Sequence, residues 1–184
     1  LGAAGAPAAD LPSVAGLCGG SGGIGGFGTQ AGVEALMASA ASIESVTPPD
    51  AVQDRISFLL NNMSMGNVEI KSVELGEILH SQAGFVSWFA NYLVVRRVAL
   101  EPNFHMLYAA LLDALAIKLL YRAILASTLQ NARVLLNSAK IRSSSSERSL
   151  LKNLGSWLGQ ITLGRNKPLL MRDFDLKEAV CDAF

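Results

Sequence analysis

The segment from Ser144 to Pro168 carries the clearest helix signals in the chain, and the rest of the sequence has to pack against it. Ser144 and Glu147 have the spacing of a capping box, in which hydroxyl and carboxylate satisfy backbone N–H groups at a helix start. Apolar residues then recur every three or four positions, so they share one helix face that must be buried. These residues are Leu150, Leu151, Leu154, Trp157, Leu158 and Ile161. We expect the helix to end at Gly164, and Pro168 to prevent its resumption.

The opposite face of this helix carries polar side chains and two glycines one turn apart, Gly155 and Gly159. Each glycine costs about 1 kcal/mol relative to alanine in a helix interior. Close approach of a neighbouring helix or of a partner protein would explain that cost, and both explanations are open at this point. The polar residues of the face are Arg148, Lys152, Asn153, Ser156 and Gln160.

Helical periodicity also organises the chain before this segment. Asp50 follows Pro48 and Pro49 as a good N-cap, and it predicts a first helix reaching Met63. The spacing predicts a weaker helix over residues 67–80 with Ile70, Val73 and Ile78 facing inward. A third helix over residues 85–98 has an aromatic stripe that is typical of a core. Its stripe is Phe85, Trp88, Phe89, Tyr92 and Val95.

A fourth helix opens with Glu101 and Pro102, because proline is favoured in the first turn of a helix. Its predicted buried stripe is Phe104, Leu107, Tyr108, Leu111, Leu112 and Leu115. His105 lies off that stripe without another His or Cys at metal-ligand spacing, so we expect a surface or boundary histidine. A fifth helix is predicted over residues 117–137, and a seventh begins near Asp173 or Asp175.

These consecutive amphipathic helices have short connections and no strand signal. They predict an all-α, irregular solenoid of antiparallel helix pairs over residues 48–184. Residues 1–47 are rich in Gly, Ala and Ser and predict a flexible linker, with a transient helix over residues 31–46. Gly20, Gly22 and Gly25 match the dinucleotide-binding pattern G-x-G-x-x-G formally, but they lack the flanking strands that a nicotinamide-dependent enzyme needs.

Composition narrows the function classes further. The most apolar long window contains Asp113, Lys118 and Arg122, which is too many charges for a bilayer-spanning helix. Two cysteines, Cys18 and Cys181, suit a reducing compartment and make the cytoplasm the simplest location.

Residues 96–184 hold thirteen basic and seven acidic side chains, which keeps direct RNA binding open as an alternative function. No metal-ligand cluster, nucleophile and base pair, or paired carboxylates can be assembled, so no cofactor or catalysis is expected.

Two segments carry a family resemblance: residues 96–115, with EPNFHMLY, and residues 133–177, with ERSLLKNLGSWLGQITLGRNKP. They closely resemble the central domain of the large scaffold subunit of the Ccr-Not deadenylase complex. That domain is HEAT-like and is similar to the middle domain of the translation-initiation scaffold. The resemblance runs from about Pro48 to the end of the chain, although residues 116–129 match poorly.

The resemblance implies a non-catalytic platform for mRNA deadenylation, decay and translational repression. In the family, the domain docks a Caf/Pop-type deadenylase nuclease and, on a separate surface, a DEAD-box RNA helicase. Other Ccr-Not subunits bind the rest of the polypeptide, and processing bodies and the nucleus become possible locations. Because the chain stops at Phe184, we expect further helices beyond it.

We expect the partner-binding residues among the outward side chains of the two matched motifs, each of which is also an ordinary surface residue in the absence of a partner. They are Asn103 and His105 from the first motif, and Arg148, Lys152, Asn153, Ser156 and Gln160 from the second.

Overall fold

The computed structural model describes residues 36, 46–82, 84–170, 175 and 177, and these contain helices and no strand. Shorter helical turns connect some of the helices: the π-helical turn η1 (Val94–Val98) and the 3-10 turns η2 (Pro102–Phe104) and η3 (Leu163–Arg165). No described helix has the length and apolarity needed to cross a membrane. The α-helices are α2 (Asp50–Asn61), α3 (Val68–Ser81), α4 (Phe85–Leu93), α5 (His105–Leu115), α6 (Lys118–Leu136) and α7 (Ser145–Ile161).

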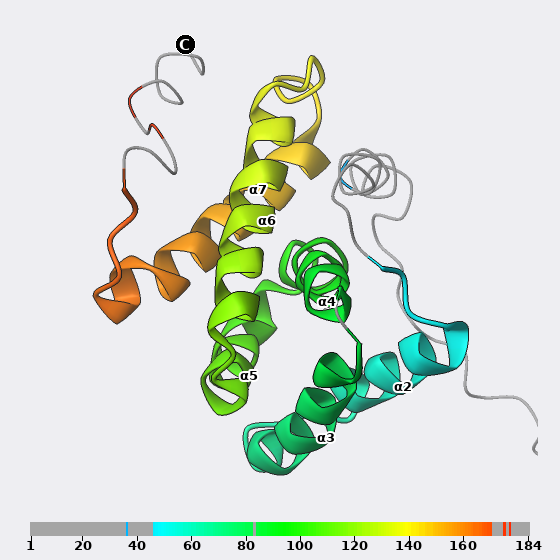
Figure 1. The fold of residues 1–184 in the computed structure, drawn as a ribbon. Coiled ribbons are helices and arrows are strands. Elements are labelled where there is room, and N and C mark those ends of the chain that lie inside the picture. Colours follow the sequence, from blue (N-terminus) through cyan, green and yellow to red (C-terminus); the bar gives the residue numbers. More distant parts are fainter. Residues whose placement is uncertain (1–35, 37–45, 83, 171–174, 176, 178–184) are drawn as a thin grey trace, which may run out of the picture.

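The helices stack in the order of the chain (Figure 1). Successive helices pack as α2 with α3, α3 with α4 and α6 with α7, while alternate helices pack as α3 on α5 and α4 on α6. Contacts between both successive and alternate helices are the pattern of a helical solenoid, in which each layer covers the next. The predicted all-α solenoid is therefore confirmed. The predicted helix near Asp173 or Asp175 and the transient helix over residues 31–46 fall almost entirely outside the described residues.

One core runs through the stack, and Trp157 on α7 lies at its centre with no exposed surface. Phe89 on α4, Leu111 on α5 and Ile124 on α6 are equally buried. Each such side chain contributes about 1.5–3 kcal/mol through the hydrophobic effect. Of the apolar stripe predicted for α7, Leu150, Leu154, Trp157 and Ile161 are buried as expected, and Leu151 and Leu158 are half-buried at its edges.

Helix α7 begins where the capping box places it but ends earlier than predicted. The Ser144 hydroxyl accepts a hydrogen bond from the Glu147 backbone N–H at 3.2 Å, whereas the Ser144 N–H donates to the Lys140 carbonyl instead of the Glu147 carboxylate. The last helical residue is Ile161, and not a residue next to Gly164. The chain turns because Asn166 adopts the left-handed conformation, with φ of 53°.

Two stripes were assigned incorrectly from the sequence. Ile70 and Val73 on α3 are 76% and 64% exposed, and the buried residues of that helix are Val68, Ser72, Leu75 and Leu79. Apolar residues lie on several sides of α3, so three- and four-residue spacing fits more than one face.

The fourth predicted helix shows the same kind of error at its start. Phe104 is 50% exposed and His105 is only 1% exposed, the reverse of what the sequence predicts. Phe104 belongs to the 3-10 turn η2, whose three residues per turn shift its phase relative to α5. His105 is the first residue of α5 and lies one turn before the buried Tyr108 and Ala109, so it shares their face.

The predicted linker over residues 1–47 is described at only three positions. Among these, Leu36 is helical and fully buried in the core cluster. The burial of Leu36 differs from the expectation that no residue of this segment takes part in the core.

Candidate partner-binding surface

The outward side of α7 is an open strip with little side-chain cover. Arg148, Lys152, Gly155 and Ser156 are exposed, and Gly159 is half-buried. At 100° per residue these positions lie opposite the buried stripe of the helix. A Cβ atom added to Gly155 or Gly159 would meet no atom within 4 Å. Packing of a neighbouring helix among the described residues therefore does not explain the glycines, and the open strip is free for a partner.

Some polar side chains of α7 form hydrogen bonds within the domain, and others do not. The Arg148 guanidinium donates to the carbonyls of Ile141 and Arg142, at 3.2 and 2.8 Å, and so holds the loop before the helix. Asn153 donates to the Ala99 carbonyl at 2.8 Å. Within the described part of the chain, Lys152 makes no hydrogen bond or ion pair, so its ammonium group is available.

Gln160 stands at the edge of the strip and is half-buried. Its Oε1 atom is buried without a hydrogen-bond partner among the described residues. An unsatisfied buried carbonyl costs about 1–3 kcal/mol, and a donor from a partner protein would offset that cost. Gln160 is therefore kept as a candidate partner-binding residue.

A groove of about 310 Å³ runs beside the strip, between the start of α7 and the residues that follow η1. Leu100 lies in it and is 38% exposed, although Leu100 was not singled out from the sequence. Its position between a π-helical and a 3-10 turn leaves no periodic signal to identify it. The groove is lined by Ala99, Leu100, Ser145, Ser146, Ser149, Leu150 and Asn153.

The turn η2 extends this surface, because both η1 and η2 contact α7. Asn103 in η2 is exposed, as predicted, and the exposed ring of Phe104 follows it. Aromatic and apolar anchors beside polar groups are typical of protein-binding surfaces. We call this region the α7 surface, and it comprises Leu100, Asn103, Phe104, Lys152, Gly155, Ser156, Gly159 and Gln160.

His105 lies beneath this surface and not on it. Its Nε2–H donates to the Val98 carbonyl at 2.9 Å, and its ring centroid lies 5.5 Å from that of Trp157. Burial lowers the pKa of the imidazole, while the Val98 hydrogen bond partly opposes that shift. The outward orientation predicted for His105 is therefore wrong, and its neutral ring ties η1 to the start of α5.

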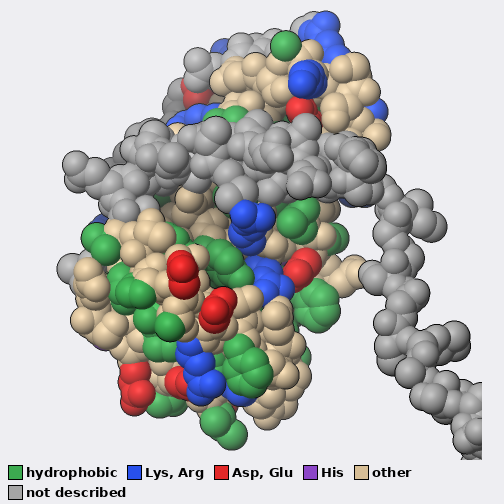
Figure 2. Space-filling view, turned by 90° about the vertical axis from the view of Figure 1, so that its right-hand side faces the viewer, with side chains coloured by type: hydrophobic (Ala, Val, Ile, Leu, Met, Phe, Trp, Pro, Cys, Tyr) green, Lys and Arg blue, Asp and Glu red, His purple; other side chains and the backbone are tan. Residues whose placement is uncertain are grey.

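A second exposed apolar area lies on α2 and α3, which are on the side shown in Figure 2. Phe58, Ile70 and Val73 are exposed there. The cationic groups of Arg55 and Lys71 lie 5.4 and 5.6 Å from the centre of the Phe58 ring. Those cations lie over the ring, and Arg55 also forms an ion pair with Glu74, so the exposed apolar side chains of this area lie among charged groups.

Comparison with known proteins assigns the domain. Residues 44–184 match the family model of the CCR4-NOT transcription complex subunit 1 CAF1-binding domain. The CCR4-NOT transcription complex subunit let-711 of Caenorhabditis elegans is 43% identical over 146 residues, 77% of this chain. General negative regulator of transcription subunit 1 is 37% identical over 133 residues in Schizosaccharomyces pombe and 35% identical over 136 residues in Saccharomyces cerevisiae, 72% and 74% of the chain.

The matched region spans about 6% of the length of each of these relatives. It includes both motifs on which the resemblance to the large Ccr-Not scaffold subunit rests, and that resemblance is confirmed. The chain therefore belongs to the family of CAF1-binding domains of CCR4-NOT transcription complex subunit 1.

Proposed function

We propose that this chain is a scaffold module that docks a CAF1-type deadenylase through the α7 surface. The match of residues 44–184 to a CAF1-binding domain supports the choice of partner. The single structural observation that supports the location is the open space above Gly155 and Gly159, where a partner backbone can approach closely. In this function the domain holds the nuclease in place and leaves the chemistry to it.

The module itself works without catalysis in this proposal. The described residues include no cluster of three His, Cys, Asp or Glu side chains able to hold a metal ion. His105, the only buried histidine among the described residues, is enclosed by the core and reaches no open site. Docking depends instead on shape, on the apolar side chains Leu100 and Phe104, and on the Lys152 ammonium group.

Three further expectations stay predictions: docking of a DEAD-box helicase, direct RNA contact and a cytoplasmic location. The largest pair of stacked rings in the described residues does not support RNA contact. Trp88 and Tyr92 stack on each other with centroids 5.1 Å apart and are half-buried, so their faces are not open to bases.

The test is binding of a purified CAF1-type deadenylase to the purified chain after nuclease treatment. We expect a complex with the wild-type chain, and binding at least about tenfold weaker with Lys152→Glu combined with Gln160→Ala. Lys152 is exposed, and Gln160→Ala removes a buried carbonyl that has no hydrogen-bond partner among the described residues, so the melting temperature should not fall.

The matched control is Lys71→Glu on α3, which reverses one half-buried lysine far from α7 in the chain. It should leave deadenylase binding unchanged. Equal binding by the α7 variant and the wild-type chain would move the docking site elsewhere. Loss of the wild-type complex on nuclease treatment would favour the RNA-binding alternative.

A further inference from the structure

A groove of about 600 Å³ opens where α5 turns into α6, apart from the α7 surface in its lining residues. Leu112, Ala116 and Ile117 give it an apolar floor, and charged side chains stand around that floor. The turn is tight because Ala116 adopts the left-handed conformation, with φ of 52°. The complete lining is Leu112, Asp113, Ala116, Ile117, Lys118, Tyr121, Arg122 and Lys167.

The groove carries a surplus of positive charge. Lys118, Arg122 and Lys167 are exposed, and none of them makes an ion pair with another described residue. Asp113 is the one carboxylate in the lining, and Arg165 binds both its oxygens at 2.6 and 2.7 Å. Because that pair is neutral, the three remaining cations determine the potential of the groove.

The start of α6 adds to this potential. No side chain caps its first turn, and the first turn contains no acidic residue. The positive end of the helix dipole therefore points toward the groove without compensation. Lys118 is the first helical residue, where a cation is unfavourable for the helix itself. A negatively charged ligand would interact favourably with the helix dipole and would offset the unfavourable position of the Lys118 charge.

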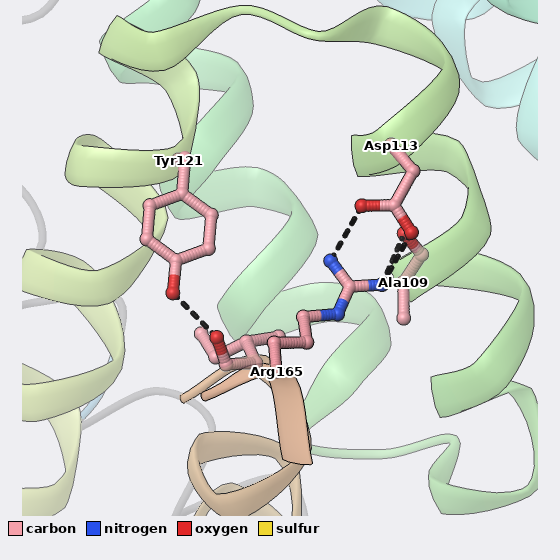
Figure 3. Close-up of polar contacts among 5 residues, drawn as sticks. Ala109, Asp113, Tyr121 and Arg165 are labelled. Carbon is pink, nitrogen blue, oxygen red and sulfur yellow. Dashed lines mark hydrogen bonds and ion pairs between the residues drawn. The ribbon is translucent and has the colours of Figure 1, made fainter. Parts of the chain in front are cut away.

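Polar contacts hold α5 and α6 in place beside the groove (Figure 3). Arg165 also donates to the Ala109 carbonyl at 3.1 Å, so η3 is tied to α5. The Tyr121 hydroxyl donates to the Ile161 carbonyl, so α6 is tied to the end of α7. The groove is thus held open by the fold, and a ligand loses little affinity to reorganisation of the protein.

The lining favours an acidic peptide over RNA. Lys167 Nζ lies 4.1 Å from the centre of the Tyr121 ring and covers one face of it. Stacking of a base on that face is therefore blocked. An apolar floor with cations at its edge instead matches a chain in which acidic and apolar side chains alternate.

From the groove, its unpaired cations and its apolar floor we infer that the α5–α6 turn is a second docking site, which takes an acidic segment of a partner protein. Lys118 and Arg122 receive its carboxylates, and Leu112 and Ile117 receive an apolar side chain between them. This inference goes beyond the proposed function, because it concerns a different surface and does not require the deadenylase.

The experiment measures fluorescence anisotropy of a short labelled peptide in which Asp and Glu alternate with Phe and Leu. The test variant is Lys118→Glu with Arg122→Glu. The control is Lys140→Glu with Arg142→Glu, which removes the same charge from the exposed loop before α7. A peptide with Lys in place of each acid and an oligoadenylate RNA serve as comparison ligands.

We expect the acidic peptide to bind the wild-type chain and to bind the test variant at least about tenfold more weakly, with the control unaffected. Binding should weaken as salt is raised. The test variant should melt no lower than the wild-type chain, because an acidic side chain in the first turn of α6 suits the positive end of the helix dipole.

Three outcomes would overturn the inference. The first is no binding of the acidic peptide to the wild-type chain. The second is an equal loss in the test and control variants, since this would mean attraction by net charge alone. The third is RNA binding that depends on Lys118 and Arg122 as strongly as peptide binding does.

Discussion

Replacing Gly155 and Gly159 by alanine should make the domain more stable and a poorer ligand for the deadenylase. Glycine in a helix interior costs about 1 kcal/mol relative to alanine, so the double variant should gain about 2 kcal/mol. The gain is available because each added Cβ meets no atom within 4 Å. For a domain of this size the melting temperature should rise by about 2–4 °C for each kcal/mol.

Binding should change in the opposite direction. If a partner backbone lies against the strip, two methyl groups separate the surfaces and the complex should weaken by about tenfold or more. Calorimetry with a purified CAF1-type deadenylase and a thermal melt of the same samples measure both effects. A rise in stability together with a loss of binding would show that the two glycines serve contact with the deadenylase and not the stability of the helix.

Gly76 on α3 supplies the matched control. A Cβ atom added there would lie 3.6 Å from Leu115 Cδ2, an ordinary contact distance, so Gly76→Ala should also stabilise the domain. Deadenylase binding should remain at the wild-type level. The reasoning is refuted if the Gly155→Ala/Gly159→Ala variant binds as tightly as the Gly76→Ala variant. It is also refuted if the double variant melts at a lower temperature than the wild-type chain.

Four other outcomes follow from burial, backbone geometry and charge. Trp157→Ala should lower the free energy of unfolding by about 3–5 kcal/mol in urea titrations, and an unchanged midpoint would mean an exposed ring. Gly84→Ala should cost at least about 1 kcal/mol, because φ is +99° and the new Cβ would lie 2.8 Å from Val46 Cγ2; a higher melting temperature would contradict that geometry. Leu36→Ala should cost about 2–5 kcal/mol because its side chain is fully buried, and no loss would identify Leu36 as a linker residue. Because burial lowers the pKa of His105 below 6.5, the wild-type chain should lose stability as pH falls from about 7.5 to about 5, and His105→Gln should lose less; equal pH profiles would place the ring in water.

The helices of this fold are readable from the sequence, because capping residues and apolar spacing act locally. Ser144 begins α7 and Trp157 faces the core, as both signals predict. The orientation of α3 was missed because Ile70 and Val73 are as apolar as the residues that are buried. The positions of α2, α4 and α5 decide which face of α3 is buried, and those positions are set by contacts outside the helix itself.

The candidate surface was accessible to sequence reasoning only in part. The glycines and Lys152 stood out because helix propensity assigns a cost to glycine and solvation favours an exposed lysine. Leu100 was missed and Phe104 was placed on the wrong side, since η1 and η2 depart from 3.6 residues per turn. His105 was placed outward although it lies three and four residues before the buried Tyr108 and Ala109 of the same helix. The groove beside α6 depends on Ala116 in the left-handed conformation, for which alanine gives no sequence signal.

Site-specific photo-crosslinking tests the central claim most directly. A photoreactive phenylalanine analogue replaces Ser156 in one sample and Ile70 in another, and each chain is irradiated with a purified CAF1-type deadenylase after nuclease treatment. Both side chains are exposed, so neither replacement disturbs the core. Docking on the α7 surface predicts a crosslinked product from position 156 and little from position 70. A product from position 70 alone would contradict the account and would place the deadenylase on α2 and α3.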